Sequence, residues 1–275
     1  MNTIPRSFLS FALVALGACN ASESKSPLSD AIDPQSPKPT IVLVHGAFAD
    51  ASSWSAVIER LEKRGYTVVA PPNLLRGPEP DGAALAGVLK TIRGPIVLAG
   101  HSYGGIVISR AAQDNPAVKA LVFVTAFIPD TGDSVVSMTE KFPPTKFGPG
   151  VLRQVPTTLA CDGGAGADVY MKNESFHEVF APDVTESTAQ VMAATQRPID
   201  GSAIPAKLVG TPAWKTVPSW ALVARKDQMI SPDAERFMAQ RAKAHVVEVD
   251  ASHAVAVSQP NTVTDLIVEA AHSVK

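Results

Sequence analysis

The alternation of short apolar segments with segments of helical periodicity is the feature that most constrains how this chain folds. Six apolar runs rich in β-branched residues follow one another from residue 40 onward. This alternation is typical of an α/β protein with a parallel sheet covered by helices. Because most of the runs are apolar without interruption, we expect strands that are buried on both faces. The predicted strands span residues 40–44, 67–71, 95–99, 119–124, 219–224 and 245–249.

The fourth and fifth predicted strands are separated by residues 125–218, a connection far longer than is usual between neighbouring elements. This segment mixes Pro/Gly-rich loops with two helix-like pieces, at residues 169–180 and 183–196. We therefore expect a cap, inserted at about residues 130–216, over the carboxyl edge of the sheet. The folded domain as a whole is predicted to span residues 40–275.

Charge and cysteine content narrow the partners of this domain. The formal net charge of the 275 residues is −2 and the basic residues are scattered, so nucleic acid is not an expected partner. A small, largely uncharged molecule is expected instead. The two cysteines, Cys19 and Cys161, do not have the spacing of a zinc site, so we predict no metal.

The amino-terminal segment has the pattern of an export signal. Residues 1–18 combine a positive start with an apolar stretch too short to span a membrane, and Cys19 follows Leu-Gly-Ala as in the lipobox of bacterial lipoproteins. Residues 19–39, rich in Ser and Pro, are predicted to form a tether. We expect an exported cell-envelope lipoprotein, held to the membrane only through lipid on Cys19. Asn20 favours the outer membrane, and ordinary signal cleavage is the alternative.

The sequence GHSYG, residues 100–104, follows the third predicted strand and precedes a helix-like segment. In this context the pattern G-x-S-x-G indicates a sharp turn that exposes a nucleophilic serine. Gly100 and Gly104 would provide the room that the strained backbone of Ser102 needs. The alternative is a purely structural turn, so the interpretation depends on partners elsewhere in the chain.

A serine hydroxyl needs a base to activate it and a third group to orient the base. His253 follows the sixth predicted strand and Asp227 follows the fifth, which gives the chain order Ser, Asp, His expected for this architecture. Both would lie at carboxyl ends of strands, where open α/β sheets bind ligands. Asp250 and Asp130 are the alternatives for the acid.

Negative charge that develops on a substrate oxygen requires hydrogen-bond donors, most often backbone N–H groups. Ala47, in the loop after the first strand, and Tyr103, directly after the serine, are the predicted donors. His45 and His101 are interpreted as structural. The candidate substrate contacts are four aromatic residues near the turn or in the cap, Phe48, Phe127, Phe176 and Phe180.

Several segments resemble bacterial serine hydrolases of the α/β-hydrolase superfamily, in the small-capped subgroup that includes plant methyl-ester hydrolases and hydroxynitrile lyases. They include LVHGAFADASSW (43–54), GHSYGGIVI (100–108), ALVFVTAFIPD (120–130) and VEVDASHAVAVSQP (247–260). The resemblance implies the α/β-hydrolase fold, with a mostly parallel sheet of about six strands flanked by helices. It also implies Ser102, Asp227 and His253 as a catalytic triad, Ala47 and Tyr103 as an oxyanion hole, and no cofactor.

The expected activity is hydrolysis of carboxylic esters with small to medium, largely apolar groups, through an acyl-enzyme. The lyases of this family carry a lysine after the catalytic histidine, whereas this chain has Ala254, which disfavours cyanohydrin cleavage. Acyl transfer, hydrolysis of a C–C bond and ligand binding without turnover are the alternatives. The sequence does not define the physiological substrate or the oligomeric state.

Overall fold

A computed structural model describes residues 38–157 and 166–274 of the chain. The predicted signal peptide, Cys19, almost all of the tether, and Cys161 lie outside the described residues. Within the described ranges, no helix is both long enough and apolar enough to cross a membrane.

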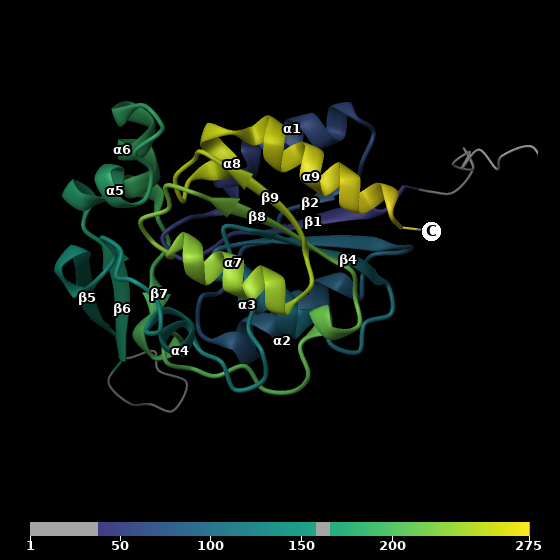
Figure 1. The fold of residues 1–275 in the computed structure, drawn as a ribbon, viewed down its shortest axis with the longest axis horizontal. Helices are drawn as coiled ribbons and strands as arrows, with labels where there is room; N and C mark the ends of the chain where they lie inside the picture. Colours follow the sequence, from purple (N-terminus) through teal and green to yellow (C-terminus); the bar gives the residue numbers. More distant parts are fainter. Residues whose placement is uncertain (1–37, 158–165, 275) are drawn as a thin grey trace, which may run out of the picture. The chain divides into compact units, whose positions relative to one another are not determined.

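A sheet of six parallel strands forms the centre of the domain, in the order β2-β1-β3-β4-β8-β9 (Figure 1). All six predicted strands are confirmed, although the second is only two residues long. Their bounds are Thr40–Val44 (β1), Val68–Val69 (β2), Ile96–His101 (β3), Val118–Val124 (β4), Ser219–Ala224 (β8) and His245–Val249 (β9). The uninterrupted apolar runs are explained by burial on both faces, since β3 and β8 are buried along their whole length.

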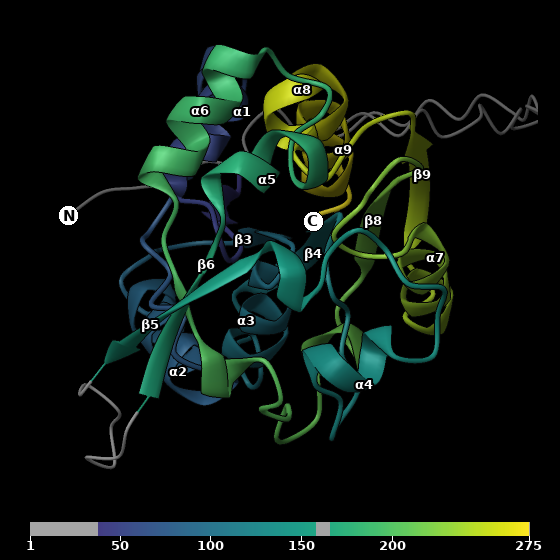
Figure 2. The same cartoon turned by 90° about the vertical axis from the view of Figure 1, so that its left-hand side faces the viewer.

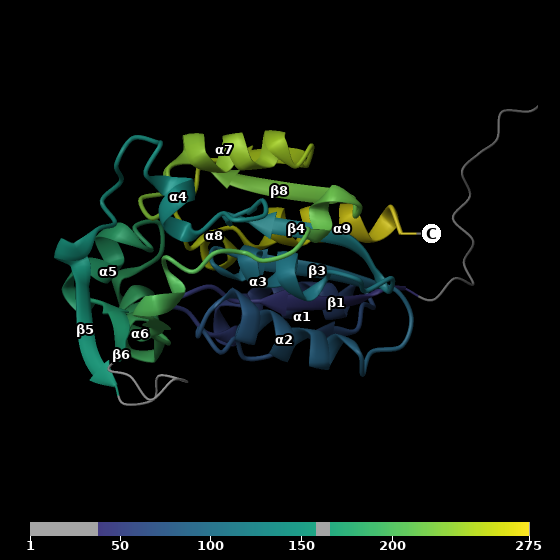
Figure 3. The same ribbon diagram turned by 90° about the horizontal axis from the view of Figure 1, so that it is seen from below.

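Helices cover both faces of this sheet (Figures 1 and 3). One face carries α1 (Ser55–Lys63), α8 (Val255–Ser258) and α9 (Pro260–His272). The other carries α2 (Pro78–Leu89), α3 (Gly104–Ala111) and α7 (Pro232–Arg241). Because side chains alternate along a strand, β1 sends Ile41 and Leu43 into the first core and Val42 and Val44 into the second.

Local sequence explains some of the helix ends. Pro232 lies in the first turn of α7, as expected, because a helix start has no hydrogen bond to lose there. The chain leaves α1 through Gly65, whose φ of 77° favours glycine. The sequence did not predict α2, which contains two prolines and two glycines and has no clear apolar stripe.

The cap consists of the elements between β4 and β8, and it lies beyond the carboxyl ends of the strands (Figures 2 and 3). The expected helix over residues 169–180 is wrong in its first part, where the chain forms a strand and then α5. An antiparallel sheet in the order β5-β6-β7 forms part of the cap. The elements are α4 (Val135–Thr139), η2 (Pro149–Val151), β5 (Leu152–Thr157), β6 (Gly166–Met171), α5 (Asn173–Val179), α6 (Glu186–Thr195), β7 (Ile199–Asp200), η3 (Gly201–Ala203) and η4 (Ala213–Lys215).

Candidate active site

Ser102 lies at the sharp turn between β3 and α3, with a φ of 52° that non-glycine residues rarely adopt. The turn is possible because the chain approaches itself closely at both flanking glycines. A methyl group on Gly100 would lie 2.6 Å from the carbonyl oxygen of Gly104. One on Gly104 would lie 2.5 Å from the carbonyl oxygen of Val44. The backbone at this serine is therefore strained and tightly enclosed.

Asp227 and His253, which follow β8 and β9, are brought together beneath the cap. Nδ1 of His253 lies 2.5 Å from Oδ2 of Asp227, and both side chains are fully buried. The other oxygen of Asp227, Oδ1, accepts the backbone N–H groups of Met229 at 2.6 Å and Ile230 at 3.0 Å. These donors fix the orientation of the carboxylate. Nε2 of His253 has no hydrogen-bond partner in the described part of the chain.

The two alternative acids are engaged elsewhere. Asp250 pairs with Arg225 at 2.6 Å, and Asp130 pairs with Lys215 at 2.6 Å. Asp250 lies three residues before His253 in sequence, but its exposed carboxylate pairs with Arg225. The structure thus brings together the serine turn, one histidine and one aspartate, each from the end of a different strand.

Aromatic rings pack around His253. The ring of Phe180, from the cap, meets it nearly at right angles, with ring centroids 4.9 Å apart. His101 lies 4.7 Å away between centroids, and its Nε2 lies 2.9 Å from the backbone oxygen of His253. Burial, with a smaller effect of the neighbouring His253, holds the pKa of His101 well below its ordinary value. His101 is therefore neutral and donates through Nε2 to the backbone that carries His253.

Ala47 and Tyr103, the predicted backbone donors, line the same cavity as Ser102. In the described ranges neither group donates a hydrogen bond to a protein acceptor. His45 holds the loop that carries Ala47. Its Nδ1 donates to the Gly46 carbonyl at 2.9 Å, and its Nε2 accepts the N–H of Asn73 at 2.9 Å. Burial lowers the pKa of His45, which keeps the ring neutral and suited to this structural role.

Asp81, which sequence reasoning missed, supports Tyr103 from behind. Its carboxylate accepts the Tyr103 hydroxyl at 2.9 Å and the backbone N–H groups of Arg76 at 2.9 Å and Gly77 at 3.2 Å. Burial raises the pKa of both Asp81 and Tyr103. Nothing in the sequence around Asp81 distinguishes it from a surface acid, because α2 has no clear apolar stripe to show which face is buried.

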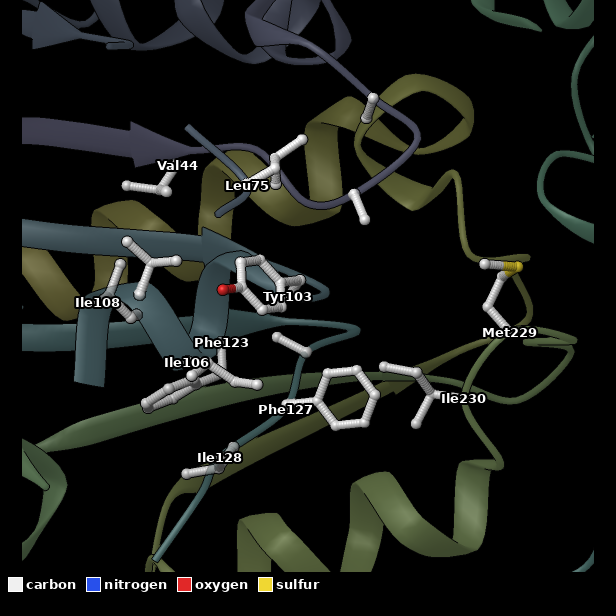
Figure 4. Packing of buried hydrophobic residues seen from close by; sticks show 14 of the residues in the cluster. Val44, Leu75, Tyr103, Ile106, Ile108, Phe123, Phe127, Ile128, Met229 and Ile230 are labelled. Carbon is white, nitrogen blue, oxygen red and sulfur yellow. The ribbon is translucent and has the colours of Figure 1, made fainter. Parts of the chain in front are cut away.

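A cavity of about 460 Å³ opens above Ser102 and is mostly apolar. The expected contacts Phe48 and Phe127 line it, whereas Phe176 and Phe180 do not. Phe176 and Phe180 are instead buried and stack on each other, with centroids 4.8 Å apart. Figure 4 shows how the buried cluster of the domain continues into the cavity wall, where Phe127, Met229 and Ile230 lie. The cap contributes Val135, Val136, Phe142, Pro143, Pro144 and Phe147.

The cap is also attached to the loop that carries His253. Asp183, between α5 and α6, accepts the backbone N–H of Ser252 at 2.8 Å and its hydroxyl at 2.5 Å. The same carboxylate accepts the hydroxyl of Ser258 at 2.9 Å. This contact restrains the position of the residue next to His253.

A parallel sheet that carries a strained serine turn at its carboxyl edge, beneath an inserted cap, defines the architecture of the α/β hydrolases. The chain belongs to the alpha/beta hydrolase family, whose model matches residues 41–266. This result confirms the family that the sequence motifs suggested.

Individual relatives agree with this assignment. A pyrethroid hydrolase of Sphingobium wenxiniae is 29% identical over 259 residues, covering 83% of this chain and 86% of that protein. Methylesterase 2 of Arabidopsis thaliana is 26% identical over 229 residues, covering 76% and 86% respectively. The crystal structure of polyneuridine aldehyde esterase matches with a TM-score of 0.72 at 19% identity, covering 85% of this chain and 99% of that one. The last likeness shows the fold.

Proposed function

We propose that this protein is a serine esterase in which Ser102 is the nucleophile, His253 the general base and Asp227 the acid that orients it. The observation that carries the proposal is the buried hydrogen bond between Asp227 and His253, which leaves Nε2 of the histidine without a partner. A base held in one orientation with an available nitrogen is what activation of a serine requires. The names of the relatives, a pyrethroid hydrolase and a methylesterase, support ester hydrolysis.

In the proposed reaction, Nε2 of His253 takes the proton of the Ser102 hydroxyl as Oγ bonds to the carbonyl carbon of the ester. The carbonyl oxygen becomes an oxyanion, which the free N–H groups of Ala47 and Tyr103 stabilise. His253 then gives its proton to the departing alcohol as the C–O bond breaks. Water, deprotonated by the same histidine, then attacks the carbonyl carbon of the acyl-enzyme. The bond to Oγ of Ser102 breaks, His253 returns the proton to Oγ, and the acid is released.

The cavity supports a neutral substrate with a sizeable apolar group. Its volume of about 460 Å³ falls in the range of sites that hold small organic molecules, roughly 300–1,000 Å³. Phe127 and Ile230 form an apolar wall, and Glu140 is the charged residue among those that line the cavity. A carboxylate in this place disfavours an anionic substrate because like charges repel. The cavity therefore favours neutral substrates with an apolar group.

The test is release of p-nitrophenol from its acetate, butyrate and hexanoate esters by the purified protein and by Ser102→Ala. We expect the parent protein to hydrolyse these esters and Ser102→Ala at the same concentration to show no turnover. The melting temperature of the variant should equal that of the parent. Equal turnover by both proteins would exclude Ser102 as the nucleophile. Folded parent protein without turnover, but with measurable binding of the esters, would point to a binding function instead.

We also propose that the protein is exported and anchored through lipid on Cys19, with residues 1–18 removed. The support is the sequence alone, in the position of the cysteine after Leu-Gly-Ala and the Ser/Pro-rich tether that follows. Expression in a Gram-negative host with labelled palmitate should give a labelled protein in the outer-membrane fraction. Label that persists in Cys19→Ala would rule out this site of attachment.

A further inference from the structure

A second carboxyl group lies buried beside the proposed triad. Glu235, in the first turns of α7, is only 2% exposed, and its Oε2 accepts the backbone N–H of Ala224 at 3.2 Å. Its other oxygen, Oε1, has no hydrogen-bond donor among the described residues. A buried carboxylate oxygen without a donor is costly, so the state of this group needs a physical explanation.

Asp227 supplies that explanation, because both acids are held at the same residue: the Asp227 N–H donates to the carbonyl oxygen of Ala224 at 3.1 Å, and the N–H of Ala224 donates to Glu235. The carboxyl groups of Asp227 and Glu235 therefore lie beside each other and interact. Two neighbouring ionised carboxylates would repel each other in a buried environment, whereas a single proton shared between them makes the contact favourable. Asp227 is already committed to accepting, since its oxygens take His253 and two backbone N–H groups. The proton therefore belongs on Glu235.

The surrounding charges agree with a neutral Glu235. Burial is the largest influence that raises the pKa of Glu235 well above its ordinary value, followed by the charge of Asp227 and the hydrogen bond to it. The N–H of Ala224 and the cation of Arg236 act in the opposite direction. Arg236 cannot offset the burial, because its guanidinium donates to Asp233 and Glu248 instead.

We propose that Glu235 keeps its proton in the folded protein and donates its O–H to Asp227, and so acts as a positioning residue for the Asp227–His253 pair. This inference rests on the proposed function for its effect on turnover. Oε1 is the protonated oxygen, because it is the oxygen of Glu235 that has no hydrogen-bond donor among the described residues. Asp227 then accepts hydrogen bonds from two backbone groups, from His253 and from Glu235, and these donors hold its carboxylate in the plane that meets Nδ1.

The amide variant separates this arrangement from an ionised glutamate. In Glu235→Gln the NH₂ group replaces the protonated oxygen as donor to Asp227, and the amide oxygen still accepts from Ala224. Glu235→Leu offers neither. With p-nitrophenyl butyrate we expect kcat to fall about 10- to 100-fold in the leucine variant, the size of losing a hydrogen bond to a charged group. KM should stay within about twofold, because Glu235 does not line the cavity.

The glutamine variant should recover most of this loss, to within about threefold of the parent kcat. The matched control is Asp233→Asn, the same acid-to-amide change on the same helix at an exposed side chain that pairs with Arg236. Loss of activity in Glu235→Gln as large as in Glu235→Leu would overturn the proposal, since it would mean that the negative charge of Glu235 is required. A leucine variant as active as the parent would also overturn it.

A spectroscopic readout tests the proton without relying on turnover. Infrared difference spectra between the parent and Glu235→Gln at pH 7 should show the C=O stretch of a protonated carboxyl group that disappears in the variant. Absence of that band would refute the neutral Glu235, even if the protein proved to be an active esterase. Presence of the band in a protein without esterase activity would uphold the protonated Glu235 and count against the proposed function. The same measurement decides the matter if the leucine variant does not fold.

Discussion

Replacing Asp227 by asparagine should nearly abolish turnover, for a reason specific to this site. The N–H groups of Met229 and Ile230 both point at Oδ1, so the carbonyl oxygen of an asparagine has to occupy that position. Its NH₂ group then faces Nδ1 of His253, where the carboxylate oxygen lay at 2.5 Å. An NH₂ donor opposite Nδ1 forces the ring proton onto Nε2. The base is then blocked at the nitrogen that should accept the serine proton.

The size of the effect follows from the tautomer. A histidine held in the wrong tautomer lowers kcat by about 10⁴-fold in a serine triad, or about 5.4 kcal/mol of transition-state stabilisation. Steady-state kinetics with p-nitrophenyl butyrate would measure the loss, and ¹⁵N spectra of the histidine ring would show the proton on Nε2. KM should change little, because Asp227 and His253 lie behind the cavity rather than in its lining.

Asp250→Asn is the matched control for this prediction. Asp250 pairs with Arg225 on an exposed loop near the same histidine, so kcat should stay within about twofold of the parent value. If Asp227→Asn kept more than a tenth of the parent kcat, or if its ring proton remained on Nδ1, the reasoning from the two backbone donors would be refuted.

Three further predictions concern stability. Gly105→Ala should lower the free energy of unfolding, measured by urea titration, by about 3 kcal/mol, because the added methyl group would lie 2.2 Å from a backbone oxygen. Gly87→Ala is the matched control: its methyl group would have nothing within 4 Å, so the free energy of unfolding should rise by about 0.5–1 kcal/mol. Tyr103→Phe removes one of three donors to Asp81 and should cost about 1.5 kcal/mol by the same titration; no loss would mean that the hydroxyl is not needed there. Burial raises the pKa of Glu235 above its ordinary 4.5, so the folded state binds a proton that the unfolded state has lost. The stability that this proton gives the folded protein is full below about pH 4.5 and is lost as the pH rises toward the folded-state pKa. The melting temperature of Glu235→Gln relative to the parent should therefore rise as the pH increases above about 4.5, and a difference that does not change with pH would contradict the assignment.

The central sheet could be predicted because its strands are buried on both faces and read as continuous apolar runs. The small sheet of the cap could not, since β5 is largely exposed and contains Pro156, which leaves little periodic signal. The chain order of Ser102, Asp227 and His253, each after a predicted strand, was enough to place three distant residues at one edge. The sequence could not predict which aromatic residues line the cavity, because the direction of side chains within the cap depends on tertiary packing.

The two buried acids near the site, Asp81 and Glu235, differ in how far the sequence could have predicted them. Asp81 carries no periodic signal because α2 lacks an apolar stripe. Glu235 did carry one, since it lies three residues before Met238 and four before Ala239, both buried on α7. A glutamate on the apolar stripe of a helix is a pattern that sequence reasoning can search for.

The hydrogen bonds from Ser252 to Asp183 have a consequence for how such proteins can be recombined. The cap and the loop that carries His253 are separate in sequence, but Asp183 makes their positions depend on each other. A cap grafted from another member of the family would therefore import a new pocket and at the same time remove a restraint on the base. Chimaeras that exchange residues 130–216 together with residues 252–258 should preserve the geometry at His253 better than chimaeras that exchange the cap alone. In this chain the cap and the loop that carries His253 therefore form one unit for recombination, made of two separate stretches of sequence.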